Sequence, residues 1–275
     1  MPSTSRRTRL PGFGLSLGYT LAYLGALVLV PLSALFIKAA GLGWPQFCSA
    51  VWTARARAAY ALTFGASAGA AIIDVILGGA VAWVLVRYEF PLKRPFDAIV
   101  DLPFALPTAV AGLVYSSLYA GSGWLGTWLV PLGIHGAYSR PAVVLVLAFI
   151  GLPLVVRTVQ PVLGSLDAEL EEAAACLGAT RRQTFARVVL PSLLPALITG
   201  FTLAFARGLG EYGSVVFVSG NMPYTTEIAP VLIVASLEAF QYREAAAIAV
   251  VLLAASLALL LVINALERWR THHGE

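Results

Sequence analysis

The sequence predicts an all-α integral membrane protein with about six transmembrane helices of roughly 20 residues each, and one long loop between the fourth and the fifth. Apolar residues make up 59% of the 275 residues. Charged residues make up only 12%, about half the roughly 25% that is typical of soluble globular domains. Mean hydropathy is +0.83. A soluble fold could not remove so much apolar surface from water, so a disordered chain, a disulfide scaffold and a soluble enzyme are excluded.

Six apolar runs give the predicted spans. They are continuously apolar and do not alternate, so we expect helices and not barrel strands. Clusters of glycine and proline separate the runs. Pro103 and Pro107 are expected to break or kink the third helix. The predicted spans are 15–37, 58–86, 102–119, 142–156 with an extension to about 162, 196–218 and 245–266.

The distribution of lysine and arginine predicts that both termini are cytoplasmic. With the N-terminus inside, twelve cations fall on the inner side and five on the outer side, and Arg207 lies inside a span. The inner ones are Arg6, Arg7, Arg9, Arg87, Lys93, Arg94, Arg157, Arg181, Arg182, Arg187, Arg268 and Arg270. The outer ones are Lys38, Arg55, Arg57, Arg140 and Arg243. The net charge of +4 therefore reflects membrane orientation and not nucleic-acid binding.

Two motifs resemble enzyme signatures without the context that those signatures need. The run 65–69 fits the G-x-S-x-G pattern of hydrolases, but it lies within a span and predicts close helix packing instead. The run 208–213 fits G-x-G-x-x-G, yet an apolar span precedes it and not a strand. Neither lysine belongs to a phosphate-binding loop. The chain is therefore expected to have no catalytic site and to bind neither ATP nor a metal; Cys48 and Cys176 are expected on opposite sides of the membrane.

The inner loop from about Arg157 to Pro195 contains strong local signals for two short helices. Ser165 or Asp167 can cap a first helix with an acidic first turn, and Gly178 can end it. Thr180 and Gln183 form a capping box for the next helix. The sequence therefore predicts a rigid helical knob on the cytoplasmic face, through which a partner could push on the spans.

This segment resembles the EAA loop of ABC importer permeases. Glu172-Ala173-Ala174 is followed after three residues by Gly178, and after nine more by Val188-x-Leu190-Pro191. Val188 stands where the family usually has isoleucine. The resemblance implies that the loop carries a coupling helix that docks in a cleft of a separate ATPase subunit. The implied coupling residues are Glu172, Ala173, Ala174, Gly178, Leu190 and Pro191.

Four further stretches, at 87–91, 101–112, 155–163 and 210–213, resemble one branch of the ABC transmembrane type-1 superfamily, the T-type permease subunits of sulfate/thiosulfate importers. The resemblance covers nearly the whole chain after about residue 15. It implies a permease core at 58–266, preceded at 1–57 by the cytoplasmic N-terminus, first span and first outer loop, and followed by a cytoplasmic tail at 267–275.

The resemblance also implies a function and a set of partners. The chain would be the translocation subunit of an ATP-driven importer that moves sulfate or thiosulfate across the bacterial inner membrane by alternating access. It would bind no cofactor itself, since ATP and Mg²⁺ would be used by a dimer of partner ATPases. A second, homologous permease subunit, a periplasmic sulfate-binding protein and membrane lipid would complete the assembly, with no nucleic acid.

The residues leave three alternative functions open. A molybdate or tungstate permease would have the same fold and a homodimeric pore. A proton-coupled secondary transporter would use Asp74 and Glu211 as carriers, although no inverted repeats are visible. A membrane-embedded enzyme would need a histidine or acid cluster, which the sequence lacks.

Polar residues within the spans are candidates for the translocation path or its gate, because charges are costly there and usually face partners or water. Arg207 and Glu211, four residues apart, can equally form a structural pair on a helix face, with Asp74 hydrogen-bonded or protonated between helices. The two acids would repel a dianion, so hydroxyl and backbone N–H groups are better contacts. The full candidate set is Thr108, Ser214, Ser219, Pro107, Asp74, Arg207 and Glu211.

Overall fold

The structure is a computed structural model that describes residues 12–272, and every regular element within that range is a helix. The all-α prediction is therefore confirmed. In chain order the elements are α1 (Phe13–Leu24), the π-helical η1 (Gly25–Leu29), α2 (Val30–Ala40), α3 (Trp44–Val51), α4 (Ala54–Arg87), α5 (Lys93–Val100), α6 (Leu102–Ala105), α7 (Thr108–Tyr119), α8 (Gly126–Leu129), the 3₁₀ turn η2 (Val130–Leu132), α9 (Arg140–Gly164), α10 (Ala168–Cys176), α11 (Arg181–Thr184), the π-helical η3 (Phe185–Val189), α12 (Leu190–Leu209), α13 (Val215–Val218), α14 (Ala229–Glu238) and α15 (Tyr242–His272).

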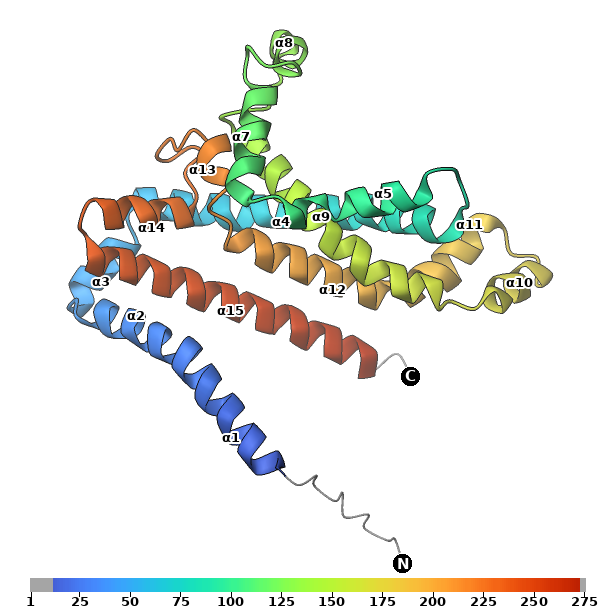
Figure 1. Ribbon diagram of the computed structural model, residues 1–275, viewed down its shortest axis with the longest axis horizontal. Coiled ribbons are helices and arrows are strands. Elements are labelled where there is room, and N and C mark those ends of the chain that lie inside the picture. Colours follow the sequence, from blue (N-terminus) through green and yellow to red (C-terminus); the bar gives the residue numbers. More distant parts are fainter. Residues whose placement is uncertain (1–11, 273–275) are drawn as a thin grey trace, which may run out of the picture.

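Three helices, α4, α9 and α12, pack against one another to form the centre of the molecule (Figure 1). Small residues let them approach closely. A Cβ atom on Gly78 of α4 would lie 3.0 Å from the Val155 side chain, and one on Gly200 of α12 would lie 3.1 Å from the Val155 backbone. Val155 of α9 is completely buried between these two glycines. Close packing of this kind holds helices together where lipid removes the hydrophobic driving force.

Five helices in the described residues are long and apolar enough to cross a membrane: Phe13–Ala40, Ala54–Arg87, Arg140–Gly164, Arg181–Leu209 and Tyr242–Ala265. Two predicted spans differ from this result. The run at 102–119 is divided, because α6 ends before Leu106–Pro107 and α7 has only 12 residues. The run at 196–218 is not one helix either, because α12 ends at Leu209 and α13 begins at Val215. Proline and glycine interrupt both apolar runs, which hydropathy alone does not reveal.

The predicted inner loop from Arg157 to Pro195 is shorter in the structure. α9 continues to Gly164, and the helix that contains α12 already begins at Arg181. The helix changes to the π-helical turn η3, which ends two residues before Pro191. In the first span, η1 ends two residues before Pro31 in the same way. A proline lacks the N–H that an α-helix needs at that position, so a local π turn rearranges the hydrogen bonds without ending the helix.

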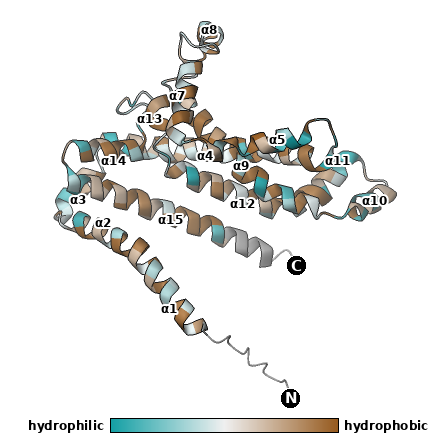
Figure 2. Ribbon diagram, in the orientation of Figure 1, coloured by the Kyte–Doolittle hydropathy of each residue, from teal (hydrophilic) through white to brown (hydrophobic). Residues whose placement is uncertain are grey.

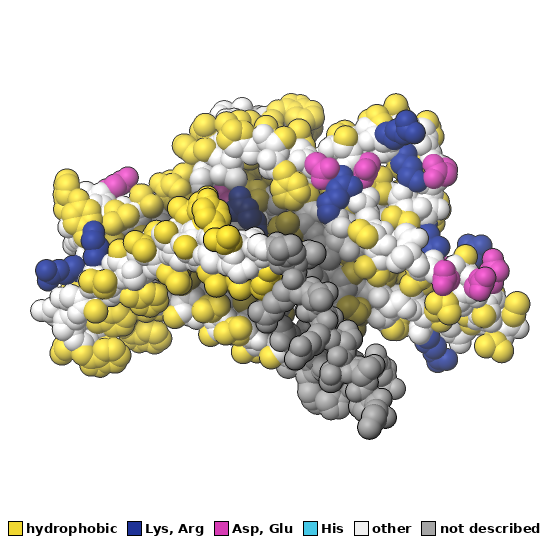
Figure 3. All heavy atoms as spheres, turned by 60° about the horizontal axis from the view of Figure 1, so that its bottom comes forward, with side chains coloured by type: hydrophobic (Ala, Val, Ile, Leu, Met, Phe, Trp, Pro, Cys, Tyr) yellow, Lys and Arg dark blue, Asp and Glu magenta, His cyan; other side chains and the backbone are white. Residues whose placement is uncertain are grey.

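The remaining helices surround the central three. α15 packs along α2, whereas α1 has no buried residue, and α7 and α8 project from the side of the bundle (Figure 1). Hydrophilic residues concentrate on short segments such as α5, α10 and α11 (Figure 2). Acidic and basic side chains gather toward the two ends of the long axis, with hydrophobic side chains over most of the middle (Figure 3). This distribution fits a bundle that crosses the hydrocarbon layer along that axis.

An ion pair with a buried acid lies at the end of the bundle opposite α10. Arg55, in the first turn of α4, donates from Nε and Nη2 to the two carboxylate oxygens of Glu227, at 2.7 and 2.6 Å. The Glu227 side chain is 1% exposed. Thr63 of α4 accepts a 2.8 Å bond from the Ala229 N–H at the start of α14. These contacts fix α14 against α4. The predicted inner cations Arg6, Arg7 and Arg9, and residues 273–275 of the predicted tail, lie outside the described residues.

Candidate functional site

The predicted helical knob is present as α10 and α11, which form two helices joined by a tight turn. Gly178 has φ +81°. The N–H groups of Gly178 and Ala179 donate to the carbonyls of Ala175 and Ala174, at 2.9 and 3.0 Å. This pair of bonds is the Schellman pattern, which requires a left-handed residue at its centre. The prediction that Gly178 ends the first helix is confirmed by this geometry.

The second helix begins with the predicted capping box. The Thr180 N–H donates to Gln183 Oε1 at 2.8 Å, and the Gln183 N–H donates to Thr180 Oγ1 at 3.4 Å. At the start of α10, Asp167 occupies the N-cap position, but its side chain makes no capping bond. Of the two predicted N-cap residues, Ser165 instead donates to the Val162 carbonyl of α9. The turn between the helices is therefore fixed by hydrogen bonds on both sides.

The structure brings four of the predicted coupling residues together at the tip. Glu172, Ala173 and Gly178 are exposed, and Ala174 is partly buried. Leu190 and Pro191 are exposed at the start of α12, beyond η3, and belong to the spanning helix and not to the knob. Leu177 is 88% exposed and Leu170 is 50% exposed on the same short helix and turn. An apolar surface of this kind, next to acidic side chains, is suited to fit against another protein.

A connection that the sequence did not predict joins this knob to the central bundle. Glu171 of α10 accepts a hydrogen bond from Arg87, the last residue of α4. The Arg87 guanidinium also lies 5.4 Å from the centre of the Trp83 ring, and Trp83 packs edge-on against Phe185 of η3, with ring centres 5.6 Å apart. The first contact connects α10 to the end of α4. The second connects α4 to η3, which continues as α12. Displacement of α10 would thus be transmitted to two of the three central helices.

Replacement of Arg87 by Gln should weaken this connection. The ion pair and the cation–π contact would both be lost, so we expect the thermal midpoint in detergent to fall by about 2–4 °C. Thermal melting of the purified variant beside the native chain checks this. Lys93→Gln is the matched control, because the ion pair that Lys93 makes among the described residues is with Glu89, whose side chain is 89% exposed. A thermal midpoint in Arg87→Gln as high as that of the control would contradict this connection.

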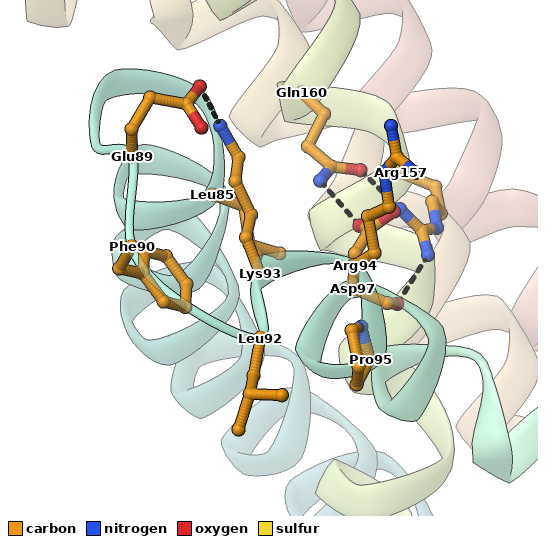
Figure 4. Close-up of a pocket in the computed structure, with 10 residues that line it drawn as sticks. All are labelled: Leu85, Glu89, Phe90, Leu92, Lys93, Arg94, Pro95, Asp97, Arg157 and Gln160. Carbon is orange, nitrogen blue, oxygen red and sulfur yellow. Dashed lines mark hydrogen bonds and ion pairs between the residues drawn. The ribbon is translucent and has the colours of Figure 1, made fainter.

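A second site missed by sequence reasoning lies where α9 meets α5 (Figure 4). Arg157 donates to both carboxylate oxygens of Asp101, at 2.8 and 2.6 Å, and to Asp97 Oδ1 at 2.6 Å. Gln160 donates to the same Asp97 oxygen at 3.0 Å. Arg157, Asp97 and Gln160 line an open pocket of about 730 Å³, together with Lys93, Arg94 and Glu89. The fork geometry of arginine suits this bidentate arrangement, which fixes the segment before α7 to α9.

The Asp97 contacts predict acid sensitivity. Hydrogen bonds from Gln160 and Arg157 hold the pKa of the Asp97 carboxyl below its usual value. A lowered folded-state pKa contributes stability above the unfolded-state pKa, and this stability is lost as pH falls through the folded-state pKa. We expect the thermal midpoint in detergent to fall between about pH 5 and pH 3, and to fall less in Asp97→Asn. The control Glu89→Gln should behave as the native chain does. An identical acid profile in Asp97→Asn would contradict this role.

Two broken helices meet beside the central bundle. A Cβ atom on Gly112 of α7 would clash with the backbone of Ser214, and one on Gly213 would clash with Thr108 Oγ1. Pro107 is the N-cap residue of α7, so the predicted break is confirmed at Pro107, whereas Pro103 lies within the first turn of α6. Thr108 and Ser214 therefore lie together at the junction between the interrupted third and fifth apolar runs. Ser219 lies beyond α13, where its Oγ accepts a 3.1 Å bond from the Asn221 N–H.

The predicted Arg207–Glu211 pair is present at this junction. Arg207 Nη1 donates to Glu211 Oε2 at 2.5 Å. The other carboxylate oxygen of Glu211 accepts bonds from the N–H and the Oγ of Ser214, both at 3.0 Å. The Glu211 side chain is 2% exposed, whereas that of Arg207 is 39% exposed. The Glu211 carboxylate is thus surrounded by hydrogen-bond donors of the protein, and the Arg207 guanidinium is partly exposed.

Asp74 lies apart from this junction. It is 1% exposed on α4, where Gly151 of α9 leaves room for one of its carboxylate oxygens and Ala204 of α12 lies close to the same glycine. Neither carboxylate oxygen has a hydrogen-bond partner among the described residues. The prediction that Asp74 is located between helices is confirmed, and the alternative that it is hydrogen-bonded there is not. Within the described residues, no cluster of His, Cys, Asp and Glu could hold a metal ion.

Comparison with known proteins shows the family to which this chain is similar. Residues 74–271 match the family described as "Binding-protein-dependent transport system inner membrane component". The sulfate transport system permease protein CysT of Escherichia coli (strain K12) is 46% identical over 97% of this chain and 96% of its own. The CysT protein of Salmonella typhimurium is 47% identical over the same shares. A probable sulfate transport system permease protein of Nephroselmis olivacea is 49% identical over 89% of this chain and 86% of its own.

Solved structures show the same fold. A chain of a bacterial ABC transporter involved in the import of alginate superposes with a TM-score of 0.75 at 19% identity, over 93% of this chain and 94% of the other. A second structure of such a transporter, in complex with a periplasmic protein bound to an alginate pentasaccharide, gives the same TM-score and identity, over 94% of each chain. These two likenesses extend over nearly the whole chain.

Proposed function

The chain belongs to the family of binding-protein-dependent transport inner membrane components, and we infer from this membership that it is the permease subunit of an ATP-driven sulfate importer. One observation carries this conclusion: proteins named as sulfate permeases are 46–49% identical to the chain along most of its length. The α10–α11 knob provides the mechanical part that such a subunit needs. The chain is a multi-pass membrane protein with a translocation role and not an enzyme.

We propose alternating access as the mechanism. ATP binding closes two partner ATPases, which carry the ATP and Mg²⁺, and their closure pushes on Glu172, Ala173, Ala174 and the turn at Gly178. Because Arg87 and the Trp83–Phe185 contact tie the knob to α4 and α12, the push tilts these helices together. The junction of the broken helices, at the end of α12, then changes its access from one side to the other.

The assembly requires further subunits. One chain forms half of a pathway, so a second, homologous permease completes it. A periplasmic sulfate-binding protein supplies the anion at the end of the molecule formed by α3 and α14, opposite α10. The solved alginate transporter with its periplasmic protein supports a partner of this kind. Much of the anion selectivity would then reside in the binding protein, and the permease would need only weak contacts.

We propose that both termini lie in the cytoplasm of a bacterial cell and that the protein lies in the inner membrane. In Figure 1, α3 and α14 lie at the left, and the first and last spans both run from there toward the α10 side, so that α1 begins at the bottom near the middle and α15 ends right of the middle. A reporter that is active only in the cytoplasm, fused after Glu275, should be active. Activity of a reporter that works only outside the cytoplasm would contradict this orientation.

Labelled sulfate uptake tests the substrate. In cells that lack their own permease subunit but keep its partners, the chain should restore uptake, and excess thiosulfate should compete. The runner-up function is molybdate or tungstate import, which has the same fold. Restored molybdate uptake without sulfate uptake would contradict the sulfate assignment and support the runner-up.

A further inference from the structure

Arg207 presents a cation in the middle of an apolar bundle. It lies in the last turn of α12, and its neighbour Gly208 packs on Ser67, where a Cβ atom would come within 3.0 Å of the Ser67 Oγ. Ser67 is near the midpoint of α4, which is long enough to cross the hydrocarbon layer completely. The guanidinium is therefore positioned deep in the membrane. Charged groups at this depth face water, a partner subunit or a substrate and not lipid.

Glu211 holds the guanidinium in place but leaves it available. Its carboxylate accepts three bonds, one from Arg207 Nη1 at 2.5 Å and two from Ser214 at 3.0 Å, and is almost fully buried. Its negative charge is offset by the adjacent Arg207 guanidinium, and both of its oxygens accept hydrogen bonds from protein donors. Arg207 makes no other hydrogen bond to a described residue, so its Nε and Nη2 donors remain unused on a side chain that is 39% exposed. These donors form a planar fork that matches two oxygens of a tetrahedral oxyanion.

The same turn carries a second source of donors. Gly213 and Ser214, two and three residues after Glu211, pack against Thr108 and Gly112 of α7. In the first turn of α7, the Val110 and Ala111 N–H groups bond the Pro107 carbonyl, whereas the N–H groups of Thr108 and Ala109 donate to no described residue. The positive end of this 12-residue helix is thereby placed on the turn that fixes Arg207. Two features favourable to anions therefore converge on residues 211–214.

We propose that Arg207, oriented by Glu211, is the transient contact for a divalent tetrahedral oxyanion such as sulfate within the membrane. This proposal rests on the proposed function and names the contact that the translocation path uses. The carboxylate neutralises part of the guanidinium charge, so the anion binds weakly enough to leave. At this depth, an arginine without a counter-charge would hold a dianion too tightly for rapid passage.

Four variants of the complete complex, with its ATPases, second permease and binding protein in proteoliposomes, separate this role from a structural pair. The double variant Arg207→Gln/Glu211→Gln replaces the ion pair by two amides that can still hydrogen-bond. The proposal predicts sulfate uptake reduced about ten-fold or more. It also predicts co-purification of all subunits, and ATP hydrolysis that loaded binding protein still stimulates to within about two-fold of the native level.

Arg207→Lys keeps the charge and loses the fork, so uptake should fall about three-fold with assembly complete. Glu211→Gln alone leaves the cation without its counter-charge, so labelled sulfate should remain on the purified complex while uptake slows. Arg94→Gln, in the first turn of α5 at the inner end, is the matched control and should transport normally. It replaces an exposed arginine that forms no ion pair with a described residue.

Near-native uptake by the double variant would overturn the proposal and leave a structural pair as the role of these residues. If the double variant does not assemble, unchanged uptake by an assembled Arg207→Lys complex together with no retained sulfate in Glu211→Gln would overturn it as well. Failure of the native complex to move sulfate would instead contradict the proposed function. Different outcomes therefore test the Arg207 contact and the proposed function.

Discussion

A chain that carries Gly178→Val is expected to insert into the membrane and to lose about ten-fold or more of its sulfate uptake, because the turn between α10 and α11 cannot form with a β-branched residue. Gly178 has φ +81°, in the left-handed region, and its N–H and that of Ala179 close the end of α10. Strain of roughly 1–3 kcal/mol at such a position would displace the tip that carries Glu172 and Ala173. Uptake, subunit co-purification and membrane content should be measured together.

The matched control for this variant is Gly164→Ala, at the end of α9. A Cβ atom there would meet no atom within 4 Å, and the backbone is not left-handed, so uptake should be unchanged. Gly178→Ala should fall between the two, since alanine suffers the backbone strain without β-branching. Native uptake in Gly178→Val, with a normal amount of protein in the membrane, would show that the shape of this turn does not matter for transport.

The second large effect is expected for Gly112→Ala at the junction of the broken helices. A Cβ atom there would lie 2.8 Å from Ser214 Cα and 2.9 Å from the Ser214 carbonyl carbon, and backbone cannot move aside as a flexible side chain can. Overpacking of this kind costs about 1–3 kcal/mol. We expect a lower thermal midpoint in detergent, together with uptake reduced about ten-fold, because α7 and the turn at 211–214 would be pushed apart.

Gly65→Ala provides the comparison for this second variant. Gly65 belongs to the apolar α4, and a Cβ atom there would meet no atom within 4 Å. Its thermal midpoint and uptake should match those of the native chain. If Gly112→Ala were as stable and as active as Gly65→Ala, the close contact between α7 and Ser214 would not exist in the working transporter.

Sequence reasoning succeeded where the determining signals are local. Gly178 and the Thr180–Gln183 capping box define helix ends over a few residues, and Arg207 and Glu211 form a pair because they are one helical turn apart. It failed at the end of α12, because the apolar residues of α13 continue the hydropathy of the span and conceal the break at Gly210–Ser214. Hydropathy records transfer into lipid, and not the continuity of backbone hydrogen bonds.

Long-range pairs could not be predicted from spacing. Arg87 and Glu171 are 84 residues apart, and Arg157 lies 56 residues from Asp101 and 60 from Asp97. One weak signal was available: Asp97 and Asp101 are four apart, as are partners on one helix face, and both need a cation near a membrane boundary. Which cation pairs with them depends on how α5 and α9 pack. The isolated position of Asp74 is likewise a property of the packed helices and not of the α4 sequence alone.

Stimulation of ATP hydrolysis in the reconstituted complex tests the central claim most directly. The complete complex should be placed in proteoliposomes and supplied, in separate experiments, with binding protein loaded with sulfate, thiosulfate or molybdate. Our account predicts that sulfate and thiosulfate accelerate hydrolysis and enter the vesicles, and that Gly178→Val abolishes both effects. A rate of ATP hydrolysis that sulfate does not change, or that rises only with molybdate, would contradict our account.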